Sequence, residues 1–191
     1  VTGDVKVDAG MLQTKRSLNS VGEDCIDDCS YRPIITADNG IDDFRTKVRN
    51  CISTAYYANA FSCPDNVPIG CWDTSEITDM AYVFSFAYSF NQPLNCWNTV
   101  RVTTMSKMFN AATTFNQPLN DWNVASVNDM DFMFNLASDF NQSLDDWNVA
   151  GVNDMSYMFW HASNFNQPLD DWNVATVTNI ERMFNLASNF N

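Results

Sequence analysis

The chain has 191 residues, of which 46% are hydrophobic, and a formal net charge of −13. This length and composition suffice for one large domain with a packed core. No run of about 18 apolar residues occurs, so the sequence predicts no membrane span. From Trp72 onward thirteen acids face only three basic residues. This balance argues against nucleic acid as a partner, because a phosphate backbone needs the opposite charge, and it favours cations, basic partners or simple solubility.

The first part of the chain divides into two predicted segments. Residues 1–41 show no clear periodicity, and we predict an irregular N-terminal segment. From residue 42 to 60, apolar side chains recur at the spacing of one helical face (Phe44, Val48, Cys51, Ile52 and Ala55). We therefore predict that residues 42–71 form a helical cap with an entry loop, followed by a repeat domain over residues 72–191.

The repeat domain has a period of 25 residues. Tryptophan recurs at Trp72, Trp97, Trp122, Trp147 and Trp172, and a Phe-Asn pair recurs in step at Phe90-Asn91, Phe115-Asn116, Phe140-Asn141, Phe165-Asn166 and Phe190-Asn191. A fixed period in this range predicts stacked units, each of which covers the open apolar face of the previous one.

Within each unit the pattern predicts a short strand and a short helix. The segment from Leu119 to Val124 carries β-compatible residues, and we assign it to a strand that pairs in parallel with its copies. Val102, Met105, Phe109 and Ala112 fall on one helical stripe. The expected N-caps are Thr78, Thr103, Asn128, Asn153 and Thr178, and Thr178 with Glu181 forms a capping box.

The whole pattern is Leu-x-x-Trp-x-Val-x-x-Val-x-x-Met-x-x-Met-Phe-x-x-Ala-x-x-Phe-Asn. It resembles the BspA-like branch of the leucine-rich repeats, and more closely the 25-residue repeat domain first catalogued in mycoplasma surface lipoproteins. The resemblance covers about residues 42–191. It implies an α/β fold, a right-handed leucine-rich-repeat-like solenoid of about five coils, with a secreted or cell-surface location. It implies no catalytic residue and no cofactor.

Six cysteines lie in the first half of the chain: Cys25, Cys29, Cys51, Cys63, Cys71 and Cys96. Their spacing is not that of a zinc site, so they are either disulfides formed in an oxidising compartment or free thiols. Cys71 and Cys96 occupy the same position of adjacent units, where parallel strands about 4.8 Å apart allow a disulfide. We predict this pair, with Cys25–Cys29 and Cys51–Cys63 as the other two.

Two polar columns follow from the repeat. Asp121, Asp146 and Asp171 form an acidic ladder, which is either a solvated edge or a set of Ca²⁺ ligands. The asparagines Asn91, Asn116, Asn141, Asn166 and Asn191 are expected to bond turn backbone groups, with an array for carbohydrate or ice as the alternative. Asn141 also begins an Asn-Gln-Ser sequon, which makes it a candidate glycosylation site in a secreted chain.

The aromatic residues fall into two sets. Those that recur in register, with Met105, Met130 and Met155, are expected to fill the core. The others lie off the repeating stripe and either mark a contact surface or pack between neighbouring helices: Trp160, Tyr157, Phe132, Phe86, Tyr82 and Tyr88. His161 has no partnered nucleophile in the sequence, so no catalytic dyad is predicted.

Together these features predict a secreted or cell-surface module and not an enzyme. We expect it to bind a protein, a glycan or copies of itself, in adhesion or structural assembly. The alternative is direct binding of Ca²⁺ or an ice surface by the ladders. The sequence ends within a unit at Asn191, so we expect either further repeats or another chain over the last coil.

Overall fold

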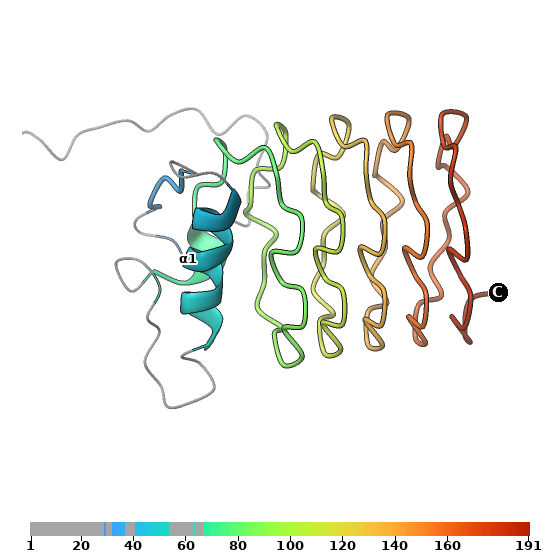
Figure 1. The fold of residues 1–191 in the computed structure, drawn as a ribbon, viewed down its shortest axis with the longest axis horizontal. Helices are drawn as coiled ribbons and strands as arrows, with labels where there is room; N and C mark the ends of the chain where they lie inside the picture. Colours follow the sequence, from blue (N-terminus) through green and yellow to red (C-terminus); the bar gives the residue numbers. More distant parts are fainter. Residues whose placement is uncertain (1–28, 30–31, 37–40, 54–62, 64–66) are drawn as a thin grey trace, which may run out of the picture.

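The structure is a computed structural model, and it describes residues 29, 32–36, 41–53, 63 and 67–191. The helix α1 (Ile41–Ser53) lies at one end of the molecule, and the short 3₁₀ helix η5 (Ile69–Cys71) leads into a row of coils (Figure 1). The coils lie side by side in chain order. Among the described residues, no helix is long and apolar enough to cross a membrane.

Successive coils stack in register at the period of the sequence. Parallel β-bridges join the equivalent residues Asp79, Thr104, Asp129, Asp154 and Asn179. Beside each bridge, alternate amides donate to the following coil, as when the Phe132 N–H bonds the Ser156 carbonyl at 2.9 Å. The backbone groups of one coil therefore find their partners about 25 residues away.

Each coil is a series of tight turns. The Met133 N–H donates to the Met130 carbonyl (3.2 Å), and the Ala137 N–H donates to the Phe134 carbonyl (3.1 Å). The third residue of each of these two turns has a positive φ, as a type II turn requires. The same two positions have φ of 52–62° in every coil, at Tyr82, Lys107, Phe132, Tyr157 and Arg182 and at Phe86, Ala111, Leu136, His161 and Leu186. None of these residues is glycine, the usual choice for this conformation.

Three columns of aromatic rings fill the inside of the coils. One phenylalanine column, Phe84 to Phe184, has ring centroids 5.3–5.6 Å apart. The other, Phe90 to Phe190, has spacings of 5.7–6.1 Å. Each repeated tryptophan is buried, and from Trp97 onward its indole N–H bonds a carbonyl 28 residues earlier, as from Trp122 to Leu94 (3.0 Å). The prediction that these aromatics form the core is confirmed.

The helix α1 covers the first coil with the apolar face that the sequence predicts. Phe44 and Val48 are completely buried, and the Phe44 ring lies 5.7 Å from that of Trp97. Helix α1 ends at Ser53, and residues 54–60 of the predicted helix lie outside the described part. Residues 32–36 run along the same coil, where Ile34 forms a parallel bridge with Asp73.

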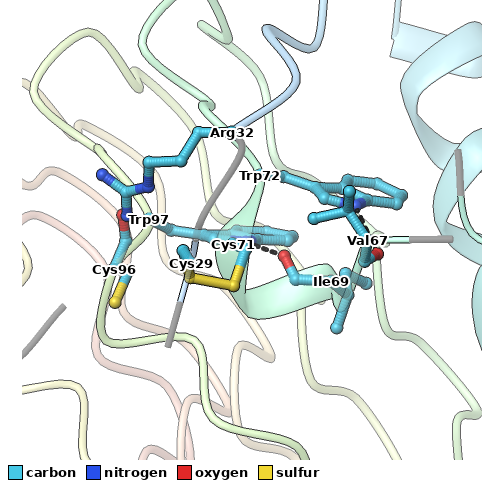
Figure 2. Close-up of a disulfide and its surroundings, with 8 residues drawn as sticks. All are labelled: Cys29, Arg32, Val67, Ile69, Cys71, Trp72, Cys96 and Trp97. Carbon is cyan, nitrogen blue, oxygen red and sulfur yellow. Dashed lines mark hydrogen bonds between the residues drawn. A yellow bond between two sulfur atoms is a disulfide. The ribbon is translucent and has the colours of Figure 1, made fainter. Parts of the chain in front are cut away.

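Two disulfides join described residues at this end of the molecule. Cys51–Cys63 joins α1 to the entry loop, as predicted. Cys29–Cys71 joins the segment before residues 32–36 to the end of η5, with Cα atoms 5.5 Å apart (Figure 2). The predicted pairs Cys71–Cys96 and Cys25–Cys29 are therefore wrong. The prediction assumed neighbouring strands at Cys71 and Cys96, but Cys71 lies in a 3₁₀ turn against the N-terminal segment. Cys96 is also disulfide-bonded, and its partner lies outside the described residues.

The predicted α/β solenoid of the leucine-rich-repeat type is wrong. Across residues 67–191 no α-helix occurs, and the only parallel pairing between coils is a series of single bridges. The expected strand at Leu119–Val124 contains a turn, which the Trp122 N–H closes on the Leu119 carbonyl (3.1 Å). The expected helix after Val102 is interrupted by positive φ at Lys107 and Ala111.

The predicted helix caps are wrong for the same reason. The Thr103 N–H donates to the Thr78 carbonyl of the previous coil (2.8 Å), and the same contact recurs at Asn128, Asn153 and Thr178. Glu181 closes no capping box; its carboxylate accepts a hydrogen bond from the Tyr157 hydroxyl. The division at residues 41 and 71 stays a prediction, since residues 1–28 lie outside the described part.

Candidate contact face

The positive-φ residues form two columns on the outside of the stack, which we call the outer strip. The first column is Tyr82, Lys107, Phe132, Tyr157 and Arg182; the second is Phe86, Ala111, Leu136, His161 and Leu186. Because equivalent residues of successive coils are neighbours, the columns run along the stack. Except for the buried Ala111, these side chains are at least partly exposed.

In the first column, rings and cations cover one another. The Lys107 Nζ lies 5.3 Å from the Tyr82 ring centroid and 5.0 Å from that of Phe132. Phe132 and Tyr157 stack at 4.5 Å, and Arg182 lies 6.0 Å from the Tyr157 centroid. Cation–π contacts at partly exposed sites contribute about 0.5–1 kcal/mol each. The first column therefore stabilises the stack from outside.

A carboxylate anchors the cation of this column. The Asp131 Oδ2 lies 2.7 Å from the Lys107 Nζ, and both side chains are largely covered. Burial alone would lower the pKa of Lys107, but the ion pair with Asp131 outweighs it, so the pKa is raised. The Tyr157 hydroxyl donates to Glu181 at 2.8 Å, and this hydrogen bond raises the pKa of Tyr157. Both groups therefore keep their protons throughout the physiological range.

The second column carries exposed apolar side chains. Phe86 is 59% exposed, Leu136 37% and Leu186 55%. The Phe86 ring meets that of Tyr88 edge-on at 6.2 Å, and Tyr88 is itself 58% exposed. Unlike the rings of the first column, these side chains do not lie between stacked neighbours.

Trp160 lies between the two columns. Its ring meets Tyr157 edge-on at 6.2 Å and His161 at 4.5 Å, and its indole N–H donates to Asn185 (3.2 Å). In the two preceding coils the same position carries Asn110 and Asn135, and the Asn135 amide donates to the Asn110 Oδ1. Trp160 ends this amide ladder, which leaves the buried Asn135 Oδ1 without a hydrogen-bond partner.

The structure thus brings three of the six off-stripe aromatics together. Phe132, Tyr157 and Trp160 form one cluster on the outer strip. They also pack on each other across coils, although the helices expected to carry them are absent. The sequence analysis missed Leu136 and Leu186. The signal that could have found them is their register with the exposed Phe86, 50 and 100 residues earlier.

A column of carboxylates runs beside the strip. Asp79, Asp129 and Asp154 each accept a hydrogen bond from the amide two residues later, which closes the turn. Burial raises the pKa of Asp129, helped by the nearby charges of Asp131 and Asp154. Burial acts in the same direction on Asp154, but hydrogen bonds from Ser156 and Asn179 outweigh it and lower its pKa.

The two polar columns predicted from the repeat make different contacts. Asp121, Asp146 and Asp171 are exposed, and Asp146 accepts a hydrogen bond from the Asn120 amide. In the part of the chain that the structure describes, no three acidic, histidine or cysteine side chains are placed to hold a metal ion. The asparagine ladder is present as predicted, since the Asn116 N–H donates to the Asn91 Oδ1 (2.9 Å) and the contact recurs to Asn191. Asn141 is partly exposed within this ladder, and its glycosylation stays a prediction.

The coils and their outer strip define a repeat protein built from turns, with a lateral strip of partly exposed aromatic and apolar side chains. The chain belongs to the family described as "Mycoplasma protein of unknown function, DUF285", whose model matches residues 31–142 and 121–191. The predicted resemblance to the mycoplasma repeat family is confirmed. The predicted relation to the leucine-rich repeats is not confirmed. No curated protein and no solved structure is similar enough to count as a match.

Proposed function

We propose that the chain is a binding module of a secreted or cell-surface protein and that it contacts its partner through the outer strip. In this role it binds and does not catalyse. The family match and the disulfides support the surface location, because disulfides persist in oxidising environments. The repeated coils support binding, because a stack of units presents one extended surface.

The observation that carries the proposal is the position of the exposed apolar side chains. Among the described residues, five exposed large hydrophobic residues belong to the outer strip or touch it: Tyr82, Phe86, Tyr88, Leu136 and Leu186. The other four lie elsewhere: Ile34, Val100, Val174 and Ile180. Exposed apolar groups that gather on one face mark interaction sites more often than scattered ones.

The test is adhesion of the purified protein to intact cells and to extracellular matrix proteins. The variant Phe86→Ser/Leu136→Ser removes two apolar groups of the strip, and Val100→Ser removes one exposed apolar group elsewhere. We expect the double variant to lose adhesion and Val100→Ser to keep it. Equal adhesion of all three proteins would contradict the proposal, as would labelling of the native protein only after the producing cells are lysed.

A further inference from the structure

We infer that the outer strip takes a basic polypeptide, whose apolar side chains lie on the second column and whose cations meet the carboxylates beside it. This inference rests on the proposed function and names the partner class for the same face. Two independent observations support it: the backbone strain at the exposed apolar residues, and the distribution of charge around them.

The first observation is the backbone strain in the second column of the outer strip. A left-handed backbone is unfavourable for an L-residue because its Cβ crowds the neighbouring carbonyl oxygen, and glycine avoids most of that strain. Phe86, Leu136 and Leu186 nevertheless occupy this conformation, with φ of 62°, 59° and 62°. In the first column the contacts between rings and cations offset the strain. In the second column the side chains are exposed, so their contribution within the chain is small. Strain of this kind is typical of functional sites, which points to a contact outside the chain.

The second observation is the negative charge of the carboxylate column beside the outer strip. Lys107 pairs with Asp131, and Arg182 lies 3.7 Å from Glu181. Asp79, Asp129 and Asp154 accept hydrogen bonds, but among the described residues none of them has a cation within 4.0 Å. Lys107 acts on Asp129 and Asp154 from a distance and favours their charged forms, and Arg45 lies over the Tyr82 ring. The carboxylates in and beside the strip still outnumber its cations, since Asp79, Asp129, Asp131, Asp154 and Glu181 face Arg45, Lys107 and Arg182. The strip is therefore bordered by an excess of negative charge.

This charge selects among the possible partners. A second copy of the chain carries the same net charge of −13, so two strips facing each other would repel. Nucleic acid and anionic lipid surfaces are repelled in the same way. A polypeptide with Lys or Arg among aliphatic residues suits both the second column and the carboxylates beside the strip. Its charge is complementary to that of the carboxylates, and complementary charge steers association and excludes wrong partners.

The experiment uses three synthetic peptides of equal length, measured by calorimetry against the whole chain. One alternates Lys with Leu, one alternates Lys with Ser, and one alternates Glu with Leu. We expect the Lys–Leu peptide to bind most tightly and its affinity to fall as salt is raised, because salt screens exposed charges. Equal binding of the Lys–Ser peptide would overturn the role of the apolar column. Tighter binding of the Glu–Leu peptide would overturn the basic partner.

Two variants locate the site. Phe86→Gly/Leu136→Gly/Leu186→Gly removes the apolar column with a residue that suits its backbone, and Asp129→Asn/Asp154→Asn removes the charge. Each should weaken Lys–Leu binding by about tenfold or more, which corresponds to about 1.4 kcal/mol. Two controls, Val100→Ser and Ile180→Ser, alter exposed apolar residues outside the strip and should leave it unchanged. Unchanged binding in both strip variants would overturn the assignment.

The failure of this inference is distinguishable from that of the proposed function. If the protein adheres to cells through the strip but prefers neutral glycans on an array over the Lys–Leu peptide, the partner class is wrong and the binding function stands. If adhesion is also unaffected by the strip variants, both are wrong.

Discussion

The inner and outer positions of the same turns use similar residues for opposite purposes. Phe134 and Leu136 are two residues apart, yet Phe134 is completely buried between Phe109 and Phe159 while Leu136 is 37% exposed. The inner position is phenylalanine in every coil, whereas the outer column reads Phe, Ala, Leu, His and Leu. The difference indicates that the repeated inner positions hold the coils together and that the varied outer positions are available for binding.

The largest effect should come from the inner column. Phe134→Ala removes a ring that stacks on both neighbouring coils, at 5.5 Å and 5.6 Å. Truncating a buried phenylalanine typically costs about 3–5 kcal/mol, because a cavity remains. We expect denaturant unfolding to show a loss of this size. The matched outer change, Phe86→Ala, should cost less than about 1 kcal/mol, and a comparable loss there would remove the distinction between the two sides.

A smaller effect should come from the buried tryptophan ladder. Trp122→Phe keeps an aromatic ring but removes the N–H that bonds the Leu94 carbonyl. A buried acceptor left without its donor costs about 1–3 kcal/mol. We expect a loss of unfolding free energy in this range. As control, Trp160→Phe removes an indole N–H from a partly exposed hydrogen bond and should have little effect.

The outer positions should be sensitive to backbone conformation and not to hydrophobicity. Leu136→Val keeps an apolar residue but places a β-branched side chain at φ of 59°. Branching at Cβ makes positive φ still less favourable, so we expect a loss of about 1 kcal/mol at this partly exposed site. Leu136→Met, which is unbranched, should be close to neutral. A neutral Leu136→Val would contradict the positive φ.

The smallest effects should come from the carboxylates beside the strip, and they should have opposite signs. The pKa of Asp129 is raised in the fold by burial, so its charged form lowers stability at neutral pH. Asp129→Asn should therefore stabilise the protein at neutral pH, and the gain should shrink as pH falls through the raised pKa. Asn179 makes the same turn contact in the last coil, so asparagine suits the site.

Asp154 is expected to respond in the opposite way to Asp129. The pKa of Asp154 is lowered, because its hydrogen bonds outweigh burial, so its charged form adds stability above the pKa of the unfolded chain. Asp154→Asn should destabilise the protein at neutral pH, and the loss should vanish as pH falls through the lowered pKa. Thermal unfolding of both variants across the acidic range measures the two curves. Curves of the same sign would contradict the assigned environments.

The sequence predicts the repeat, the face of α1, the core aromatics and the asparagine ladder, because each depends on spacing alone. The path of each coil could not be predicted in this way. Val102, Met105 and Phe109 are spaced as on a helix, but consecutive tight turns produce similar spacing. What decides between the two is the hydrogen bonds to residues 25 positions away and the positive φ of residues such as Lys107. Neither leaves a local signal in the sequence.

The same limit applies to the contact face and to the cysteines. Aromatics off the repeating stripe such as Trp160 are noticeable in a sequence, whereas Leu136 is marked only by its register with Phe86, and the exposure of both depends on the path of the coil. The pairing of Cys29 with Cys71 depends on where the N-terminal segment lies, which spacing does not determine.

The second column of the outer strip occupies left-handed turn positions, and the stabilities of two triple variants measure this backbone conformation. Phe86, Leu136 and Leu186 are changed together to glycine in one protein and to alanine in the other, and their free energies of unfolding are measured. Both variants lose the same side-chain atoms beyond Cβ, so the difference reports the backbone. We predict that the glycine variant is more stable, by about 1 kcal/mol per site, because glycine accepts positive φ. In a helix or a strand alanine is favoured by about the same amount, so a more stable alanine variant would contradict the account.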